Sequence, residues 1–310
     1  MDGILLLNKP KGLTSHDCVF KIRKMVRMKK VGHTGTLDPD VSGVLPICIG
    51  RATKIVEYLT AAEKTYEGEV TLGISTTTED ASGDVVEQVS VNRSYSREEI
   101  LDILFKLTGE ITQTPPMYSA IKVNGKRLYE YARKGIIVDR PSRVVTIKEL
   151  SLLDDREVFE GETISFRFRV VCSKGTYVRT LAVMMGELLG LPAHMSDLTR
   201  TASGNYSIEE CLSFEEIEEK LSSGTLGEDL LSIESGISHL PKYEINDKVA
   251  EKVKNGAVLL LPDALQDIHQ GDEICLYTTM GKCIAIYERH KQKPQLMKPV
   301  KVLVNNQELH

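Results

Sequence analysis

Apolar and polar residues alternate along several short stretches of the chain, and this alternation is typical of β-strands. Every second residue is apolar or aromatic over residues 164–172 (ISFRFRVVC), and a similar alternation runs from Tyr66 to Leu72. Residues 3–8 (GILLLN) are apolar in four consecutive positions, which favours a short buried strand. We therefore expect strands at these three places.

Helices are predicted where apolar residues recur at helical spacing after a capping residue. Thr14 or Ser15 caps the first helix, and two capping boxes, each a serine three residues before a glutamate, open helices after Ser96 and Ser213. A further helix is expected over residues 181–189. The helix after Ser96 is expected to bury four apolar side chains, those of Ile100, Leu101, Leu104 and Phe105.

The pattern changes after about Ser238, and residues 239–310 are predicted to form a separate, small β-rich domain. Two apolar stretches there, ICLYT and KCIAIYE, are joined through Met280 and Gly281, which indicates a hairpin. In residues 1–238 strands and helices are mixed without a regular βαβ rhythm. This mixture favours an α+β fold for the first domain.

The overall charge argues against a nucleic-acid partner, but its distribution changes that picture. The chain of 310 residues has 39 basic and 44 acidic side chains and a net charge of −5. Residues 1–60, 121–150 and 281–301 each have a net charge of +5, whereas residues 61–120 and 205–236 have −7 and −8. Basic blocks that share one face would steer a polyanion. The alternative is that these lysines and arginines only solvate exposed faces.

Targeting signals and cysteine usage indicate a soluble, cytoplasmic protein. The N-terminal apolar stretch is shorter than the core of a signal peptide, and no segment approaches the length of a membrane span. Six cysteines are scattered without a CxxC pair, which is typical of reduced, mostly buried thiols.

The densest group of candidate functional residues lies in the segment GHTGTLDPDVSG, from Gly32 to Gly43. Its glycines and Pro39 permit a tight turn that brings His33 and Asp38 into one compact loop. Ionisable groups on such a scaffold often carry function. From composition alone, however, Asp38 could equally be a turn or capping residue and His33 a satisfied loop histidine.

Residues 32–50 (GHTGTLDPDVSGVLPICIG) closely resemble the catalytic motif of the TruB-type pseudouridine synthases, bacterial enzymes that isomerise uridine 55 in the TΨC arm of tRNA. Six further segments match this family in the expected order: LNKPKGLTSHD (7–17), EKTYEGEVTLG (63–73), TTTEDASGD (76–84), QTPPMYSAIKVNGKRLYEYARKG (113–135), CSKGTYVRTLA (172–182) and LTRTASG (198–204). Seven colinear matches make coincidence very improbable.

The resemblance implies that three residues perform the chemistry. Asp38 is the catalytic aspartate, because cleavage of the glycosidic bond leaves an electron-poor C1′ that a carboxylate can stabilise or trap. Arg179 pairs with Asp38 and is expected to lower the pKa of its carboxyl group. Tyr66 stacks on the target base and is the candidate for removing a proton.

The resemblance also implies a set of substrate contacts, because the target uridine must be unstacked before it can react. Leu198 packs on the other face of the base, and His33 enters the space left by flipped nucleotides. Asp80 contacts a flipped neighbour or orients His33. Lys9 and Tyr177 are also assigned to substrate binding, and Lys9 is expected to support the active-site loop.

The fold implied by the resemblance is a mixed, largely antiparallel sheet flanked by helices, followed by a PUA-like RNA-binding domain. Residues 120–145 match an insertion that closes over the RNA arm, and Tyr129 and Tyr131 within it suit a stacking surface. The expected partner is the TΨC stem-loop of tRNA, bound by a monomer without guide RNA and without a membrane. No cofactor or metal is expected, since the chain has no dinucleotide fingerprint, P-loop or Cys/His cluster.

Two other functions remain open at this point. A non-catalytic RNA-folding factor could have the same architecture, although intact Asp38, Tyr66 and Arg179 weigh against it. An aspartate-dependent glycoside hydrolase would need a second carboxylate placed as the acid, which the sequence does not locate.

Overall fold

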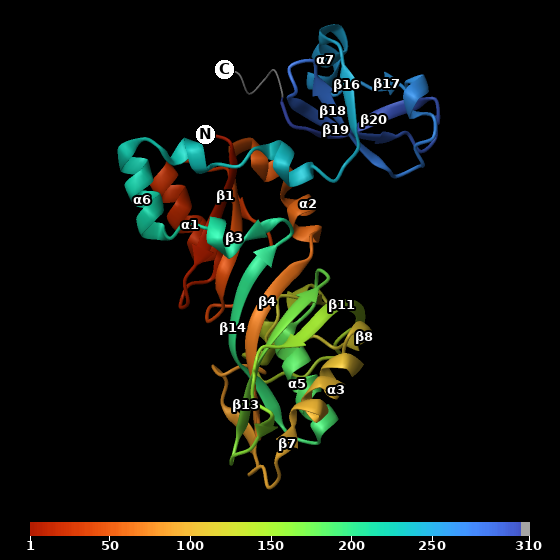
Figure 1. Cartoon of the computed structure of the whole chain (residues 1–310). Helices are drawn as coiled ribbons and strands as arrows, with labels where there is room; N and C mark the ends of the chain where they lie inside the picture. The colour runs from red at the N-terminus through yellow and green to blue at the C-terminus, as the bar shows by residue number, and fades with distance from the viewer. Residues whose placement is uncertain (305–310) are drawn as a thin grey trace.

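The computed structural model describes residues 1–304 and contains one large sheet and one smaller sheet, with helices packed around them (Figure 1). The large sheet has nine strands in the order β1-β3-β14-β4-β13-β11-β8, with β2 beside β3 and β15 beside β14. Its strands are β1 (Gly3–Lys9), β2 (Val31–His33), β3 (Ser42–Ile49), β4 (Lys64–Leu72), β8 (Gly109–Gln113), β11 (Arg143–Leu152), β13 (Ile164–Cys172), β14 (Ala193–Ser203) and β15 (Tyr206–Ser207).

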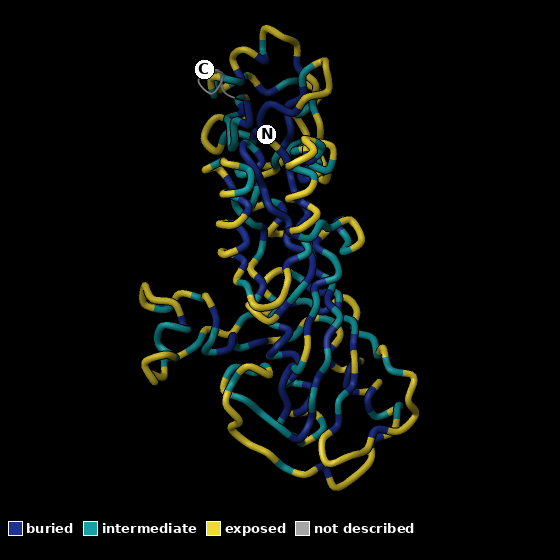
Figure 2. The backbone as a smooth tube through the Cα atoms, turned by 90° about the vertical axis from the view of Figure 1, so that its left-hand side faces the viewer, coloured by how far each residue is buried: buried dark blue, intermediate teal, exposed yellow. Residues whose placement is uncertain are grey.

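Pairing in the large sheet is antiparallel except between β14 and β3, which run parallel. The sheet is therefore mixed and largely antiparallel, as predicted. Alternation of buried and half-buried residues along β4 confirms the strand expected there, and β1 and β13 confirm the other two. Figure 2 shows the buried residues following these strands through the middle of an elongated molecule, with exposed residues in the peripheral loops.

Seven α-helices are found within the described residues: α1 (Ser15–Val26), α2 (Val56–Ala61), α3 (Arg97–Lys106), α4 (Leu128–Ala132), α5 (Val178–Leu189), α6 (Phe214–Ser223) and α7 (Asp247–Lys254). Thr14 caps α1, and the capping boxes predicted at Ser96 and Ser213 open α3 and α6. Short 3₁₀ helices complete the connections: η1 (Gly50–Ile55), η2 (Ile208–Glu210), η3 (Leu226–Asp229), η4 (Ile233–Ile237) and η5 (Asp263–Leu265).

The buried face of α3 differs from the prediction. Ile100 and Leu104 are buried as expected, but Leu101 and Phe105 are 43% and 79% exposed. The helix packs instead through Ile103, since residues three and four positions apart form one stripe on a helix. Leu101 and Phe105 lie beside that stripe, so their burial was wrongly predicted from hydrophobicity alone.

Three two-stranded ribbons lie outside the large sheet. They are β5 (Ile74–Thr76) with β6 (Val85–Gln88), β7 (Tyr95–Ser96) with β12 (Val158–Phe159), and β9 (Lys122–Val123) with β10 (Lys126–Arg127). The last ribbon and α4 form part of the insertion predicted at residues 120–145.

The C-terminal sheet has five strands in the order β16-β18-β19-β20-β17. They are β16 (Lys242–Ile245), β17 (Leu259–Leu260), β18 (Glu273–Thr278), β19 (Cys283–Arg289) and β20 (Leu296–Val302), and β18 with β19 confirms the predicted hairpin. Figure 1 shows this sheet at one end of the molecule, beyond β1 and α2.

One hydrophobic cluster joins the C-terminal sheet to the rest of the chain. Ile4 of β1 and Ile55 of η1 belong to the same buried cluster as Cys275, Ile286 and Leu303. The two sheets are therefore packed together, although each has a hydrophobic cluster of its own.

All six cysteines are free thiols, and only Cys211 is less than fully buried, in agreement with the prediction of reduced thiols. Within residues 1–304, no helix combines the length and apolar character needed to cross a membrane.

Candidate active site

The loop that contains Asp38 connects β2 to β3 and is held by a buried lysine. Lys9, whose side chain has no exposed surface, donates hydrogen bonds from Nζ to the carbonyl oxygens of Pro10 (2.9 Å), Pro39 (3.0 Å) and Val41 (2.7 Å). Two of these acceptors lie on the C-terminal side of Asp38. Lys9 thus supports the loop, as the resemblance implied, but it has no free surface for the substrate contact that we also predicted.

A second buried residue fixes the loop from α1. The backbone N–H of Leu37 donates to Ser15 Oγ at 2.8 Å, and this hydroxyl donates to the Leu37 carbonyl at 3.2 Å. Beyond the loop, Gly43 has a φ of +107°, and a Cβ atom there would lie 2.1 Å from the carbonyl oxygen of Arg200. Only glycine fits this close approach of β3 to β14.

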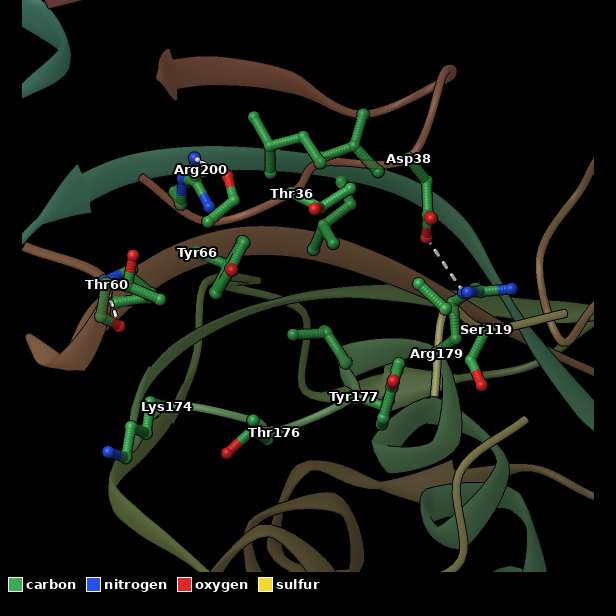
Figure 3. Close-up of a pocket in the computed structure, with 18 of the residues that line it drawn as sticks. Thr36, Asp38, Thr60, Tyr66, Ser119, Lys174, Thr176, Tyr177, Arg179 and Arg200 are labelled. Carbon is green, nitrogen blue, oxygen red and sulfur yellow. Dashed lines mark hydrogen bonds and ion pairs between the residues drawn. The ribbon is translucent and has the colours of Figure 1, made fainter. Parts of the chain in front are cut away.

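The carboxylate of Asp38 meets the guanidinium of Arg179, which lies near the start of α5 (Figure 3). Arg179 Nε is 3.0 Å from Asp38 Oδ2, and Arg179 Nη1 is 3.6 Å from Asp80 Oδ2. Nη1 also donates to the carbonyl oxygen of Thr78 (2.8 Å), and Nη2 donates to that of Tyr118 (2.9 Å). With 6% of its side chain exposed, the guanidinium is fixed from several sides, whereas 42% of the Asp38 side chain is exposed.

Burial raises the pKa of the Asp38 carboxyl above its ordinary value, and the positive charge of Arg179 opposes that rise. Arg179 lowers the pKa of Asp38, as predicted. Burial is the larger of the two effects, so the pKa of Asp38 is raised overall.

Asp38 opens into a cavity of about 300 Å³, which we name the Asp38 cavity. This volume is at the lower end of the range for small-molecule sites. Figure 3 shows Asp38 and Arg179 near one end and Thr60 and Lys174 near the other. The lining side chains come from strands β4 and β14, from the Asp38 loop, and from the segment that leads into α5, and they include Leu37, Tyr66, Thr176, Tyr177, Leu198 and Arg200.

Tyr66 and Leu198 supply neighbouring parts of the wall. The two residues lie on paired strands, where Leu198 is opposite Gly68 and Tyr66 is opposite Arg200. A Cβ atom on Gly68 would be 2.8 Å from Leu198 Cδ1 and 3.0 Å from Phe168 Cζ, so this glycine makes the space that Leu198 occupies. Burial raises the pKa of Tyr66, which keeps its phenol protonated at neutral pH.

Tyr177 also lines the cavity and is fixed through its backbone. The amide of Gln113 donates to the Tyr177 carbonyl at 3.2 Å and accepts from the Tyr177 N–H at 3.0 Å. The guanidinium of Arg143 lies 4.9 Å from the centre of the Tyr177 ring. Both Arg143 and Tyr177 are half-buried, so each presents some surface to the cavity.

His33 and Asp80 are not in contact in this structure. Asp80 Oδ1 accepts hydrogen bonds from Thr78 Oγ1 (2.6 Å) and from the hydroxyl (2.6 Å) and N–H (3.0 Å) of Ser82. The Nδ1 atom of His33 is buried without a hydrogen-bond partner, and burial lowers the pKa of this imidazole. The prediction that Asp80 orients His33 is therefore not met in this structure, and His33 does not line the Asp38 cavity.

A smaller cavity of about 190 Å³ lies beside Asp38 and Leu198 as well. Asp80, Ser82 and Asp197 contribute to its lining. Asp38 and Leu198 thus border two cavities, one that holds Tyr66 and one that holds Asp80.

In the insertion, the two predicted stacking tyrosines already have partners. Arg127 and Arg133 lie 5.9 and 5.3 Å from the centre of the Tyr129 ring, and the Tyr131 hydroxyl donates to the Val123 carbonyl at 3.0 Å. These contacts tie α4 to its neighbouring ribbon.

Sequence reasoning missed two buried cations of the cavity. Arg200, which is 1% exposed, donates to the carbonyls of Val44 (2.7 Å) and Gly35 (3.3 Å). Lys64, which is 6% exposed, donates to the carbonyls of Leu59 (3.1 Å) and Ala62 (2.7 Å), and burial lowers its pKa to about 8. Both residues lie within segments that match the family motifs, residues 63–73 and 198–204, and this match is the sequence signal that could have identified them.

Family comparisons agree with this geometry. A model described as the TruB family pseudouridylate synthase N-terminal domain matches residues 23–178. A second, described as the tRNA pseudouridylate synthase B C-terminal domain, matches residues 179–237. The chain belongs to the TruB family. The join between the two matches falls at the start of α5, between Val178 and Arg179, so both matched segments build the Asp38 cavity.

Relatives of similar length are known within the TruB family. A tRNA pseudouridine synthase B from Bacillus cytotoxicus is 61% identical over 309 residues, which covers 100% of this chain and 99% of the relative. Another from Geobacillus thermodenitrificans is 62% identical over 302 residues, or 97% of this chain and 99% of the relative.

Among solved structures, one chain of a Cbf5–Nop10–Gar1 complex superposes with a TM-score of 0.72 at 27% identity, covering 98% of this chain and 86% of that chain. A chain from an H/ACA RNP bound to a substrate RNA containing 2′-deoxyuridine gives a TM-score of 0.71 at 25% identity, covering 97% and 85%. The TruB chain therefore has the pseudouridine synthase fold that its motifs implied.

Within residues 1–304, no cluster of three or more His, Cys, Asp and Glu side chains is arranged to hold a metal ion.

Proposed function

We propose that this TruB family member isomerises uridine 55 in the TΨC arm of tRNA to pseudouridine. Its relatives at 61% and 62% identity are named tRNA pseudouridine synthase B. The observation that carries the proposal is the ion pair between Asp38 and the buried Arg179, located where the Asp38 cavity also presents Tyr66 and Leu198.

The reaction moves the ribose from N1 to C5 of the same uracil. When the bond between N1 and C1′ breaks, its electron pair remains on the uracil, and the carboxylate of Asp38 stabilises or traps the electron-poor C1′. The ring then rotates and C5 bonds to C1′, which breaks any bond formed between C1′ and Asp38. The proton on C5 leaves to a base and N1 takes up a proton, so the product is an isomer of the substrate. Nothing is oxidised or reduced, so this chemistry requires no redox cofactor.

Arg179 keeps Asp38 ionised and oriented. Its guanidinium opposes the rise in pKa that burial imposes on the carboxyl, and its hydrogen bonds to backbone carbonyls fix the direction from which it holds Asp38. Arg179 is therefore proposed to act through Asp38 and not by contacting the reacting atoms.

Tyr66 and Leu198 are proposed to hold the flipped uracil between an aromatic ring and an aliphatic side chain. Tyr66 remains the candidate acceptor of the C5 proton. Since burial raises its pKa, the phenol of Tyr66 is protonated at neutral pH, and it would have to lose its own proton before it could accept the C5 proton as a phenolate. The release of tritium from tRNA that carries [5-³H]uridine tests this role, because Tyr66→Phe retains the ring and removes only the hydroxyl.

The other contacts proposed here follow from position. Tyr177 contacts the nucleotide in the Asp38 cavity, and Asp80 contacts a flipped neighbour in the smaller cavity beside it. His33 is proposed to fill the space that flipped nucleotides leave. The insertion at residues 120–145 closes over the RNA arm.

We also propose a division of the chain into a catalytic domain, residues 1–238, and a PUA-like RNA-binding domain, residues 239–310. The protein would act in the cytoplasm as a monomer without guide RNA. Light scattering of the free protein and of its tRNA complex measures this stoichiometry directly.

The deciding experiment incubates the protein with an unmodified tRNA transcript and measures pseudouridine at position 55. We expect product with the wild-type chain and none with Asp38→Ala. A transcript with cytidine at position 55 controls for modification elsewhere. If wild type binds and refolds tRNA without forming pseudouridine, the chain is an RNA-folding factor and the catalytic proposal fails.

A further inference from the structure

A second groove continues from the Asp38 cavity toward the C-terminal sheet. We name it the α2 groove, and its volume is about 550 Å³. Thr60 and Lys174 line both spaces, so the two are contiguous. Its other lining residues come from η1, α2 and β20, and they are Thr53, Lys54, Val56, Glu57, Ala61 and Lys301.

An ion pair spans this groove between the two parts of the chain. Lys301 Nζ on β20 is 3.0 Å from Glu57 Oε1 on α2, with 36% and 60% of these side chains exposed. Beside this pair, Lys54 Nζ donates to the Val302 carbonyl at 3.0 Å. The groove therefore holds two lysines near the junction of the two sheets and a third, the exposed Lys174, beside the Asp38 cavity.

The three basic blocks of the sequence meet along this path. Lys54 belongs to the block at residues 1–60, Arg143 to the block at 121–150, and Lys301 to the block at 281–301. Arg143 lines the Asp38 cavity, while Lys54 and Lys301 line the α2 groove. Positive charge from segments far apart in the sequence is thus placed along one continuous depression, which suits a polyanionic strand.

We propose that the RNA strand leaving the Asp38 cavity runs through the α2 groove. One phosphate lies beside Lys174, and another displaces the Glu57 carboxylate from its ion pair with Lys301. This inference rests on the proposed function. An exposed carboxylate and ammonium stabilise each other only slightly, so a phosphate can replace the carboxylate at small cost. In the free protein the Glu57 carboxylate occupies the anion position beside Lys301.

If phosphates bind in the α2 groove, the affinity for tRNA should depend on salt concentration, because each phosphate contact releases counterions when it forms. Binding of full-length tRNA is measured by fluorescence anisotropy between about 0.05 and 0.3 M salt. For Lys301→Ala and for Lys174→Ala we expect the slope of log K against log salt to fall by roughly one, and affinity near 0.1 M salt to fall by up to about tenfold.

Glu57→Gln tests the exchange of anions. Removing the competing carboxylate is expected to raise affinity roughly two- to fivefold, which is the range of one exposed ion pair. Adding Lys301→Ala in the Glu57→Gln background should abolish this gain, because the phosphate then has no ammonium to contact.

Lys298→Ala is the matched control. Lys298 lies on the same strand, pairs with Glu288 at 2.9 Å, and is 37% exposed, but it does not line the groove. It should leave both slope and affinity unchanged. The proposal is overturned if Lys301→Ala retains the wild-type slope, if Lys298→Ala lowers it equally, or if Glu57→Gln fails to raise affinity in protein whose thermal unfolding matches wild type.

An isolated TΨC stem-loop separates this proposal from the function on which it rests. If wild type forms no pseudouridine in this stem-loop or in full tRNA, the proposed function fails. If pseudouridine forms while the groove variants bind tRNA like wild type, only the path through the groove fails.

Discussion

Arg179 Nε lies 3.0 Å from Asp38 Oδ2, and the arginine of this pair is the more deeply buried partner. The positive charge is fixed by backbone carbonyls, while the carboxylate faces the cavity. A charge that is already oriented stabilises an ionised carboxylate without reorganisation during the reaction. The pair is thus arranged to keep Asp38 ionised despite the burial that raises its pKa.

Replacement of Arg179 should therefore change the pH profile as well as the rate. In Arg179→Ala, the pKa of Asp38 loses the charge that lowers it, so the acidic limb of kcat/KM moves to higher pH, and turnover falls by about 10² or more. Arg179→Lys, which keeps the charge, should restore the limb in part. Turnover at several pH values and tRNA affinity are measured together. A loss confined to affinity, or an unmoved limb, would contradict the role proposed for Arg179.

Lys9 and Lys11 offer a comparison within three residues of sequence. Lys9→Met leaves the carbonyls of Pro39 and Val41 without their buried donor, and we expect the free energy of unfolding to fall by about 1–3 kcal/mol. Lys11 makes an exposed ion pair with Asp197, so Lys11→Met should cost about 1 kcal/mol or less. Urea denaturation measures both. Equal losses would show that Lys9 does not hold the Asp38 loop.

The strands and helix starts could be predicted because their signals are local. Alternation over residues 164–172 and the capping boxes at Ser96 and Ser213 depend on neighbours a few positions away. The same local view failed for Leu101 and Phe105, because which side of an apolar helix is covered depends on the sheet that it packs against.

The site required a different kind of information. No periodicity relates Asp38 to Arg179, and their pairing was expected only from the resemblance to a family. Lys64 and Arg200 were missed because a buried cation and an exposed one look alike in sequence. Their partners are backbone carbonyls, which leave no trace in residue identity.

Substitution of Gly68 tests whether the wall of the Asp38 cavity requires a residue without a side chain at this position. In Gly68→Ala the new methyl group would meet Leu198 and Phe168, and such overpacking typically costs about 1–3 kcal/mol. Since Leu198 would have to move, turnover should fall more than tRNA affinity. Gly227→Ala is the control, because a Cβ atom there would meet nothing within 4 Å. If the two variants unfold at the same urea concentration and turn over equally, the cavity wall does not depend on Gly68.

The buried amine of Lys64 should make the free energy of unfolding depend on pH in the alkaline range. Burial lowers the pKa of this amine from 10.5 to about 8 in the folded protein, so between these values the unfolded chain binds the extra proton. The free energy of unfolding must then rise with pH across that window, and the penalty for the buried charge is constant below it. At about 1.4 kcal/mol per pKa unit, the change amounts to roughly 3 kcal/mol.

Lys64→Met removes this titration, so the difference in unfolding free energy between wild type and variant should shift in favour of wild type by that amount between pH 8 and 10.5. The other titrating groups contribute equally to both proteins, so their effects cancel in this difference. Urea denaturation of wild type and variant at the same pH values measures it. A difference that stays constant across the window would show that Lys64 keeps its ordinary pKa and that the wall beside Tyr66 is more hydrated than its geometry indicates.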